Sequence, residues 1–425
     1  MDKIREYFSL KERNTDLRTE CIAGITAFLT VSYGFLLIPA IMSRIGISFS
    51  SAYFSVMLAF SVANIYLGIS TDLPLLLRPS IVVAVYYAYI VVLSVGATCY
   101  EGTAVLVFAG VSMVVMSLSG WREKIVSKIP AVLRIGITAG IGLMMLILGL
   151  RLGKIIVSSP FALAAVGDIV NPVMFVSLLG LVITTVFCVN KIKGAVLWGM
   201  LISGAVSYEL DYIADLPGLF KIPVGLEKLT WGISLENFDR YVFLCIVILL
   251  TAIFESSAVI IGNDFTNKSV RAANKADSVG TLFSACLGMV PMVFSPEARI
   301  VEICRGKTGV VPLVAGILGM VMIFCEPVMC EIAEMPAVFV PALIITGAGL
   351  LIRLKETDTS DMANLIPVFV MLTIMAVTSN IAAGIGSGVI LYVLLRSFSG
   401  RSNEITKELY LLAVLFLGYY MYMLI

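Results

Sequence analysis

The sequence predicts an all-α integral membrane protein with fourteen transmembrane spans in a seven-plus-seven inverted repeat, whose third and tenth spans are broken by short extended segments. Three observations predict this class: an apolar composition, a series of span-length apolar runs, and an uneven distribution of basic residues. Hydrophobic residues make up 60% of the 425 residues and charged residues 13%, whereas soluble domains are about half apolar and about a quarter charged. A soluble fold could not bury so much apolar surface, but a bilayer can.

Apolar runs of the length that crosses a bilayer, about 17 to 25 residues, recur along the whole chain. Uninterrupted runs lie at 21–43, 50–69, 102–119, 131–150, 173–189, 194–212, 240–262, 309–325, 336–352, 364–380 and 382–398. Stretches interrupted by proline or charge lie at 73–95, 278–291 and 292–304. The final stretch, 408–425, is either an extra span or a helix on the membrane surface.

The spans divide the chain into two repeats. Because seven is an odd number, the second repeat is inverted relative to the first, an arrangement common among transporters. The predicted organisation is a cytoplasmic segment 1–20, a first repeat 21–212, an extracytoplasmic connection 213–239, a second repeat 240–398, and a C-terminal segment 399–425 with an extra apolar helix.

The basic residues support this count. With the N-terminus in the cytoplasm, the predicted inside connections hold most of the 29 Lys and Arg residues, as the positive-inside rule expects. Arg122 and Lys268 are two of them. The first apolar run is too long for a signal peptide and lacks a cleavage site. We therefore expect a multi-pass protein of the inner or plasma membrane.

The third and tenth spans are interrupted at equivalent places in the two repeats. One carries the sequence LRPS at 77–80 and the other FSPE at 294–297. Proline is favoured at the first position of a helix, and Ser295 can cap the helix that would follow it. Each segment is therefore expected to be an extended stretch that leads into a half-helix. Broken spans in corresponding places are the best sequence indication of a transporter's binding site.

Ionisable side chains inside spans are costly and usually functional. Glu255 lies in the middle of the eighth span, and Glu297 begins the half-helix of the tenth. Each could bind substrate or carry a coupling proton, and Glu255 could instead be a structural carboxylate paired with a basic residue. Arg78 and Arg299 either neutralise these carboxylates or attract an anion. The predicted substrate-binding set is Glu255, Glu297, Arg78, Ser80, Ser295 and Arg299.

Other functional classes are not indicated. The net charge of +1 gives no sign of a nucleic-acid partner. The chain has no histidine, which removes the commonest metal ligand and the usual proton carrier near neutral pH. We expect no metal, no cofactor and no enzymatic activity, and any proton coupling would use carboxylates. The eight cysteines form no Cys-x-x-Cys pair and are expected to pack as small hydrophobic residues.

Several motifs resemble those of a known transporter family over nearly the whole chain. They are RTECIAGITAFLT at 18–30, NKADSVGT at 274–281, GKTG at 306–309, IPVF at 366–369 and IAAGI at 381–385. Together they resemble the purine-permease branch of the nucleobase–cation symporter-2 group, the branch named for azaguanine resistance.

The resemblance implies a core domain, a gate domain and proton-coupled uptake of purine bases of the guanine, hypoxanthine and adenine class. The family's acidic residue of the eighth span falls on Glu255, and its glutamate of the tenth span falls on Glu297. The resemblance thus implies that these residues contact substrate and couple transport to protons.

This chain departs from the family pattern at the site itself. Arg78 stands where a small residue is usual, and the asparagine of the third-span motif is missing. Three hypotheses follow: a proton-coupled purine transporter, a small-anion transporter that uses Arg78 and Arg299, and a non-transporting sensor or scaffold. The expected partners are a purine base, a proton and the lipid bilayer, and the choice between monomer and homodimer stays open.

Overall fold

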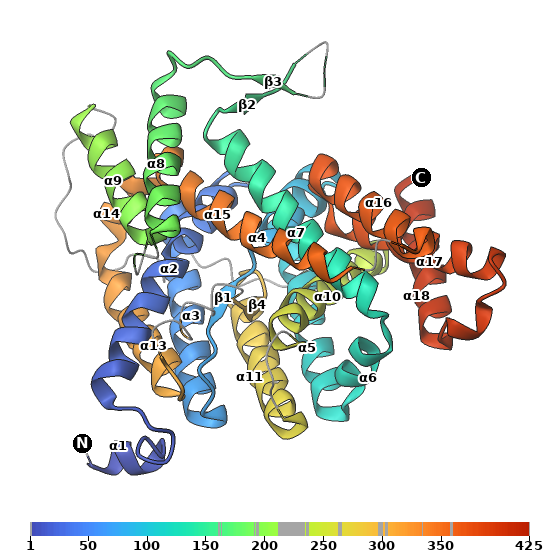
Figure 1. Ribbon diagram of the computed structural model, residues 1–425, viewed down its shortest axis with the longest axis horizontal. Coiled ribbons are helices and arrows are strands. Elements are labelled where there is room, and N and C mark those ends of the chain that lie inside the picture. Colours follow the sequence, from blue (N-terminus) through green and yellow to red (C-terminus); the bar gives the residue numbers. More distant parts are fainter. Residues whose placement is uncertain are drawn as a thin grey trace.

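The fold is known from a computed structural model, which describes residues 2–159, 162, 164–190, 192, 195–210, 234, 238–261, 266–295, 301, 305–333, 335–357 and 360–424. Within these residues the chain is mostly helical, with two short antiparallel strand pairs (Figure 1). Glu297 and Arg299 lie outside the described residues, as does most of the predicted connection 213–239.

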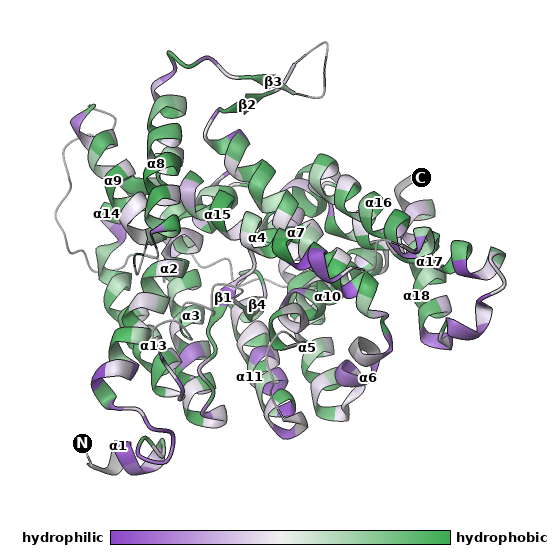
Figure 2. Cartoon of the chain, in the orientation of Figure 1, coloured by the Kyte–Doolittle hydropathy of each residue, from purple (hydrophilic) through white to green (hydrophobic). Residues whose placement is uncertain are grey.

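Eight helical stretches of the described residues are long and apolar enough to cross a membrane. They are Leu17–Ser43, Phe49–Thr71, Cys99–Ser119, Ala131–Leu152, Pro172–Val189, Val310–Ala333, Pro336–Glu356 and Ile381–Phe398. Three shorter apolar helices accompany them, at Ile81–Ser94, Tyr241–Ser257 and Met362–Thr378. Figure 2 shows that hydrophobic residues dominate these helices. The chain is therefore a multi-pass integral membrane protein.

One group of helices surrounds the strands β1 (Leu77–Pro79) and β4 (Met292–Phe294), which lie side by side near the centre of the molecule (Figure 1). Helix α4 follows β1 directly. The group consists of α2 (Leu17–Ser43), α3 (Phe49–Thr71), α4 (Ile81–Tyr86), α5 (Cys99–Ser119), α10 (Phe238–Ile261), α11 (Asn267–Cys286), α13 (Val310–Met322) and α14 (Glu326–Ala333).

A second group packs beside the first. Its members are α7 (Ala131–Leu152), α8 (Pro172–Val189), α9 (Ala195–Glu209), α15 (Val340–Leu351), α16 (Met362–Thr378) and α17 (Ile381–Phe398). Glycines allow close approach of helices here: a Cβ added to Gly142 of α7 would lie 2.7 Å from the carbonyl oxygen of Gly347 in α15. Small residues at such positions let transmembrane backbones pack tightly.

The structure corrects the predicted start of the ninth span. The prediction placed it at 278–291, but α11 begins at Asn267, after the N-cap Thr266, and ends at Cys286. A search for apolar runs misses the first half of α11 because that half carries Lys268, Arg271 and Lys275. Two further features were not predicted: the hairpin of β2 (Ile156–Val157) and β3 (Ala165–Val166), and the π-helix Tyr87–Ser94 that continues α4.

The C-terminal apolar stretch forms α18 (Lys407–Leu424), which runs antiparallel to α17 along its length. Tyr410 lies 3.1 Å from Ser397 near one end of the pair, and Asn380 donates to the hydroxyl of Tyr419 over 3.0 Å near the other. Leu409, Leu412, Ala413, Phe416 and Tyr419 are buried, whereas Leu411, Val414, Leu417 and Met421 are exposed. The exposed face of α18 is thus apolar rather than charged, which fits lipid contact through the bilayer better than a position on its surface.

Candidate functional site

The candidate site forms where two short extended segments, β1 and β4, lie side by side. β1 and β4 pair antiparallel, with Arg78 opposite Val293 and Pro79 opposite Met292. Two backbone bonds extend the contact beyond the strands: Ser80 donates its N–H to the carbonyl of Pro291 over 2.9 Å, and Ser295 donates its N–H to the carbonyl of Leu76 over 2.8 Å. The predicted extended segments are therefore present, and they satisfy each other's backbone groups at a depth where water is scarce.

Side chains of neighbouring helices satisfy the remaining backbone groups. The amide of Asn64 in α3 accepts from the N–H of Leu77 and donates to its carbonyl, both over 2.9 Å. For β4, Thr281 of α11 donates to the carbonyl of Met292 over 2.8 Å, and Ser256 of α10 accepts from the N–H of Phe294 over 3.2 Å. The strands are thus fixed by polar residues of three helices.

A buried ion pair joins β1 to α10. Nη2 of Arg78 lies 3.0 Å from Oε1 of Glu255, and the two side chains are 2% and 4% exposed. Ser80 donates its hydroxyl to Oε2 of the same carboxylate over 2.6 Å, and its oxygen accepts from the N–H of Val83 as the N-cap of α4. Both oxygens of Glu255 therefore bind the segment that begins the half-helix α4.

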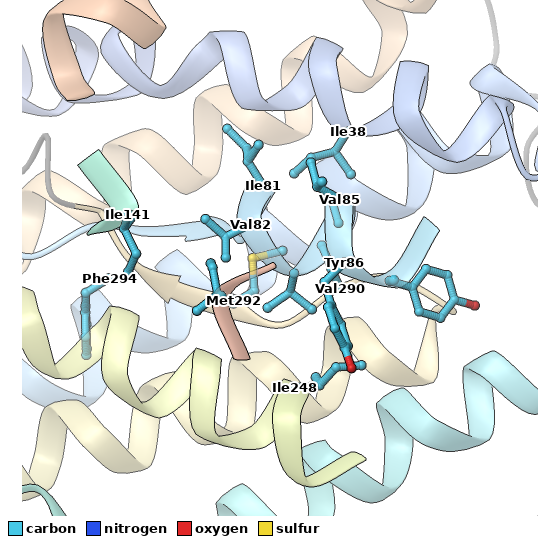
Figure 3. Packing of buried hydrophobic residues seen from close by; sticks show 14 of the residues in the cluster. Ile38, Ile81, Val82, Val85, Tyr86, Ile141, Ile248, Val290, Met292 and Phe294 are labelled. Atoms are coloured by element: carbon cyan, nitrogen blue, oxygen red, sulfur yellow. The ribbon is translucent and has the colours of Figure 1, made fainter. Parts of the chain in front are cut away.

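The surroundings of this polar cluster are apolar. Figure 3 shows the α4 side chains, including Val82 and Tyr86, among Ile141 of α7, Ile248 of α10 and Met292 of β4, all members of one buried cluster. A charged pair in such surroundings has lost its hydration. Removing one partner of a buried pair leaves an uncompensated charge, at a typical cost of about 3–5 kcal/mol.

The structure brings together three of the six predicted site residues: Arg78, Ser80 and Glu255. Ser295 is fully buried directly after β4, and its backbone bond to Leu76 places it beside the same strands. The other two predicted residues, Glu297 and Arg299, lie outside the described residues. Among the described residues, no group of three or more His, Cys, Asp or Glu side chains is placed to hold a metal ion.

A second buried ion pair was not predicted. Arg122 of α6 (Trp121–Lys128) and Asp277 of α11 are both fully buried, with Nη2 and Oδ2 2.5 Å apart. Arg122 also donates to the carbonyl of Asn274 and to the hydroxyl of Ser278. The sequence alone places Arg122 in a connection between spans. The one sequence signal for this pair is Asp277, the acidic residue inside the motif at 274–281.

Two of the family-like motifs also meet, at the end of the second broken span. The carboxylate of Glu20, which is fully buried, accepts from the backbone N–H groups of Lys307 and Thr308 and from the hydroxyls of Thr308 and Thr15. The motif at 18–30 thus holds the motif at 306–309. Two further residues complete this clamp on the segment 306–309: Arg13 donates to the carbonyl of Lys307, and Asp72 accepts from the N–H of Gly309.

The described residues form a bundle of membrane-spanning helices around the paired segments β1 and β4, with a buried ion pair beside them. The chain belongs to the permease family whose model, Xan_ur_permease, matches residues 18–387. This membership confirms the resemblance to the nucleobase–cation symporter-2 group. The protein is accordingly a transporter and not an enzyme.

Proteins with similar sequences align with almost the whole chain. The guanine/hypoxanthine permease PbuO of Bacillus subtilis is 28% identical over 96% of this chain and 98% of its own. The adenine permease AdeP of Escherichia coli is 25% identical over 97% of this chain and 95% of its own. At this identity the chain is a divergent member of the group.

Solved structures share the fold. The transmembrane domain of the cyanobacterial bicarbonate transporter BicA superposes with a TM-score of 0.61 at 15% identity, covering 88% of this chain and 97% of that domain. Murine Slc26a9 in its inward-facing state gives 0.60 at 13% identity, covering 90% and 69%. Both likenesses concern the fold alone.

Proposed function

We propose that the protein is a secondary active transporter that takes up purine nucleobases of the guanine, hypoxanthine and adenine class together with a proton. The permeases named above, which share its full length, support the substrate class. The observation that carries the proposal is the buried carboxylate of Glu255, held by Arg78 and Ser80 at the start of a half-helix.

The chemistry of Glu255 suits this role. An ionised carboxylate only accepts hydrogen bonds, and the ring N–H and amino groups of a purine are donors. The same carboxylate can take up a proton when its contact with Arg78 is broken, because a buried charge is expensive unless it is paired. Glu297, which follows the predicted break of the tenth span, is the second candidate for substrate binding or proton coupling, with Ser295 and Arg299 near it in the sequence.

Alternating access gives the two helix groups their roles. We infer that the group around β1 and β4 is the core domain, that the group of α7–α9 and α15–α17 is the gate, and that transport occurs as one rocks against the other. This inference includes the fourteen spans in two inverted repeats, 21–212 and 240–398, an N-terminus in the cytoplasm and a location in the inner or plasma membrane.

The small-anion alternative has less support from the site. Its requirement is a cationic site, but Arg78 is paired with Glu255 at 3.0 Å, which leaves the pair with no net charge. The small-anion hypothesis would then depend on Arg299 alone. Uptake of labelled bicarbonate or sulfate that is lost on substituting Arg299 would favour it.

The test is uptake of labelled guanine, hypoxanthine and adenine by cells that lack their own purine permeases, with and without a protonophore. The proposal predicts saturable uptake that the protonophore abolishes. An absence of uptake for all three bases, with the protein shown to be in the membrane, would contradict it and would equally fit the sensor or scaffold hypothesis.

A further inference from the structure

We propose that the guanidinium of Arg78 is a tethered competitor of the substrate, which occupies the carboxylate of Glu255 until a base displaces it. The substrate class follows from this: a planar ligand edge with two adjacent N–H donors, as guanine presents. The inference rests on the proposed function and assigns Arg78 a role in setting affinity.

The geometry shows what a ligand must replace. Arg78 donates from Nη2 to Oε1 of Glu255 over 3.0 Å, and Ser80 donates to Oε2 over 2.6 Å. Arg78, Ser80 and Glu255 are all buried. A base that donates to both oxygens of Glu255 must therefore replace Arg78 at Oε1 and Ser80 at Oε2.

The protein donors that a base must displace and the base itself offer the carboxylate similar hydrogen bonds. In the structure the carboxylate has two donors, the planar guanidinium of Arg78 at Oε1 and the hydroxyl of Ser80 at Oε2. Guanine presents its ring N1–H beside its 2-amino group, which is a similar flat pair of donors. Adenine presents an amino group beside an acceptor nitrogen, and hypoxanthine presents one ring N–H beside a carbonyl. Guanine is thus the base whose adjacent donors best replace Arg78 and Ser80 at the two carboxylate oxygens.

The displaced side chain keeps a local partner. Nη1 of Arg78 lies 3.3 Å from the carbonyl oxygen of Pro79, and this bond does not involve Glu255. Arg78 belongs to β1, whose backbone is fixed by Asn64 and β4. Exchange between arginine and base therefore needs a rotation of the Arg78 side chain and no rearrangement of the strands.

A competitor of this kind lowers apparent affinity. A ligand that binds only the fraction of protein with a free site has its apparent dissociation constant divided by that fraction. Because hydrogen bonds between charged groups are comparatively strong, removing the arginine should lower the KM for guanine by about tenfold. A purely structural arginine would give no such gain.

The experiment compares guanine uptake into proteoliposomes by the wild type, Arg78→Ala and Arg78→Met, with free guanidinium ion as the probe. Alanine leaves a space for the ion, so guanidinium chloride should inhibit Arg78→Ala competitively at concentrations that leave the wild type unaffected. Both variants should show the lower KM. Arg122→Met removes an equally buried arginine that is paired with Asp277 and not with Glu255, and it should show neither effect.

The outcomes separate this inference from the proposed function. Wild-type uptake of guanine, combined with an unchanged or higher KM in both Arg78 variants and no effect of guanidinium, would overturn the competitor role and leave the transporter proposal intact. Failure of both variants to fold would also overturn it, because the arginine would then be structural. Absence of uptake in the wild type and both variants would reject the two proposals together.

Discussion

Arg78 and Glu255, which are 177 residues apart in the sequence, form a 3.0 Å ion pair that joins the two halves of the chain inside the membrane. The pair ties the first broken span to α10, and Ser80 reinforces it through the second oxygen of the carboxylate. The same contact therefore serves two purposes: it satisfies a buried charge, and it holds the acceptor that we propose for the substrate.

The first prediction concerns the energy of this pair. Arg78→Met and Glu255→Gln should each destabilise the protein by about 3–5 kcal/mol, because each leaves its partner as a buried, uncompensated charge or donor. The double variant should recover much of that loss, since it leaves no charge behind. Thermal unfolding of the purified variants in detergent measures the double-mutant cycle. Additive losses in the double variant would show that the two groups are not coupled.

A second prediction concerns the clamp that Glu20 forms on the segment 306–309. Glu20→Gln replaces one acceptor oxygen with an amino group that cannot accept from the N–H groups of Lys307 and Thr308. The expected loss is about 1–3 kcal/mol, the usual cost of an unsatisfied buried group. Glu12→Gln is the matched control because Glu12 lies in the same segment and is exposed. Equal unfolding temperatures for Glu20→Gln and the wild type would contradict the clamp.

A third prediction concerns the path of α18. Because it lies antiparallel to α17 with an apolar exposed face, we expect it to cross the bilayer and to place the C-terminus outside the cell. A C-terminal alkaline phosphatase should be active and a C-terminal fluorescent protein dark, and truncation after Gly400 should reverse both. Fluorescence from the full-length fusion would show that α18 does not cross.

A fourth prediction concerns the dependence of stability on pH at the N-terminal end of α16. The N–H of Ala363 and the guanidinium groups of Arg401 and Arg396 lower the pKa of Asp361 below its usual value of 3.8. A carboxylate whose folded-state pKa is depressed stabilises the fold above its unfolded pKa and loses that contribution as the pH falls through the folded value.

The unfolding temperatures of the wild type and Asp361→Asn should therefore differ by a constant amount from about pH 7 to about pH 5 and converge below about pH 4. The nearby titratable group Glu404, which pairs with Arg396, stays in both proteins. A difference that grows on acidification would contradict the assignment.

The sequence predicted the membrane class and the paired breaks because both leave local signals. Apolar runs are visible in composition, and the proline at position 79 marks the point where β1 ends. The pairing of β1 with β4 left no such signal, because strands of three residues carry too little pattern to fix a register. The fourteen spans and the roles of the site residues stay predictions.

The ion-pair partner of Glu255 could not be predicted from the sequence either. From the sequence alone, either Arg78 or Arg299 could be its counter-ion. In the described residues, β1 lies against α10 and places Arg78 beside Glu255. The buried pair of Arg122 and Asp277 was missed for a related reason. The first half of α11 is polar in sequence, so hydropathy predicts a loop there, but the structure packs it as a helix against α5 and α6.

Proton-driven uptake of labelled guanine into proteoliposomes, for the wild type and Glu255→Gln, tests the central claim most directly. The wild type should accumulate guanine when the outside is more acidic than the inside. Glu255→Gln, once its folding has been verified by thermal unfolding, should not accumulate guanine under the same gradient. Uptake by Glu255→Gln with the wild-type KM and maximal rate would show that the buried carboxylate neither binds the base nor carries the proton.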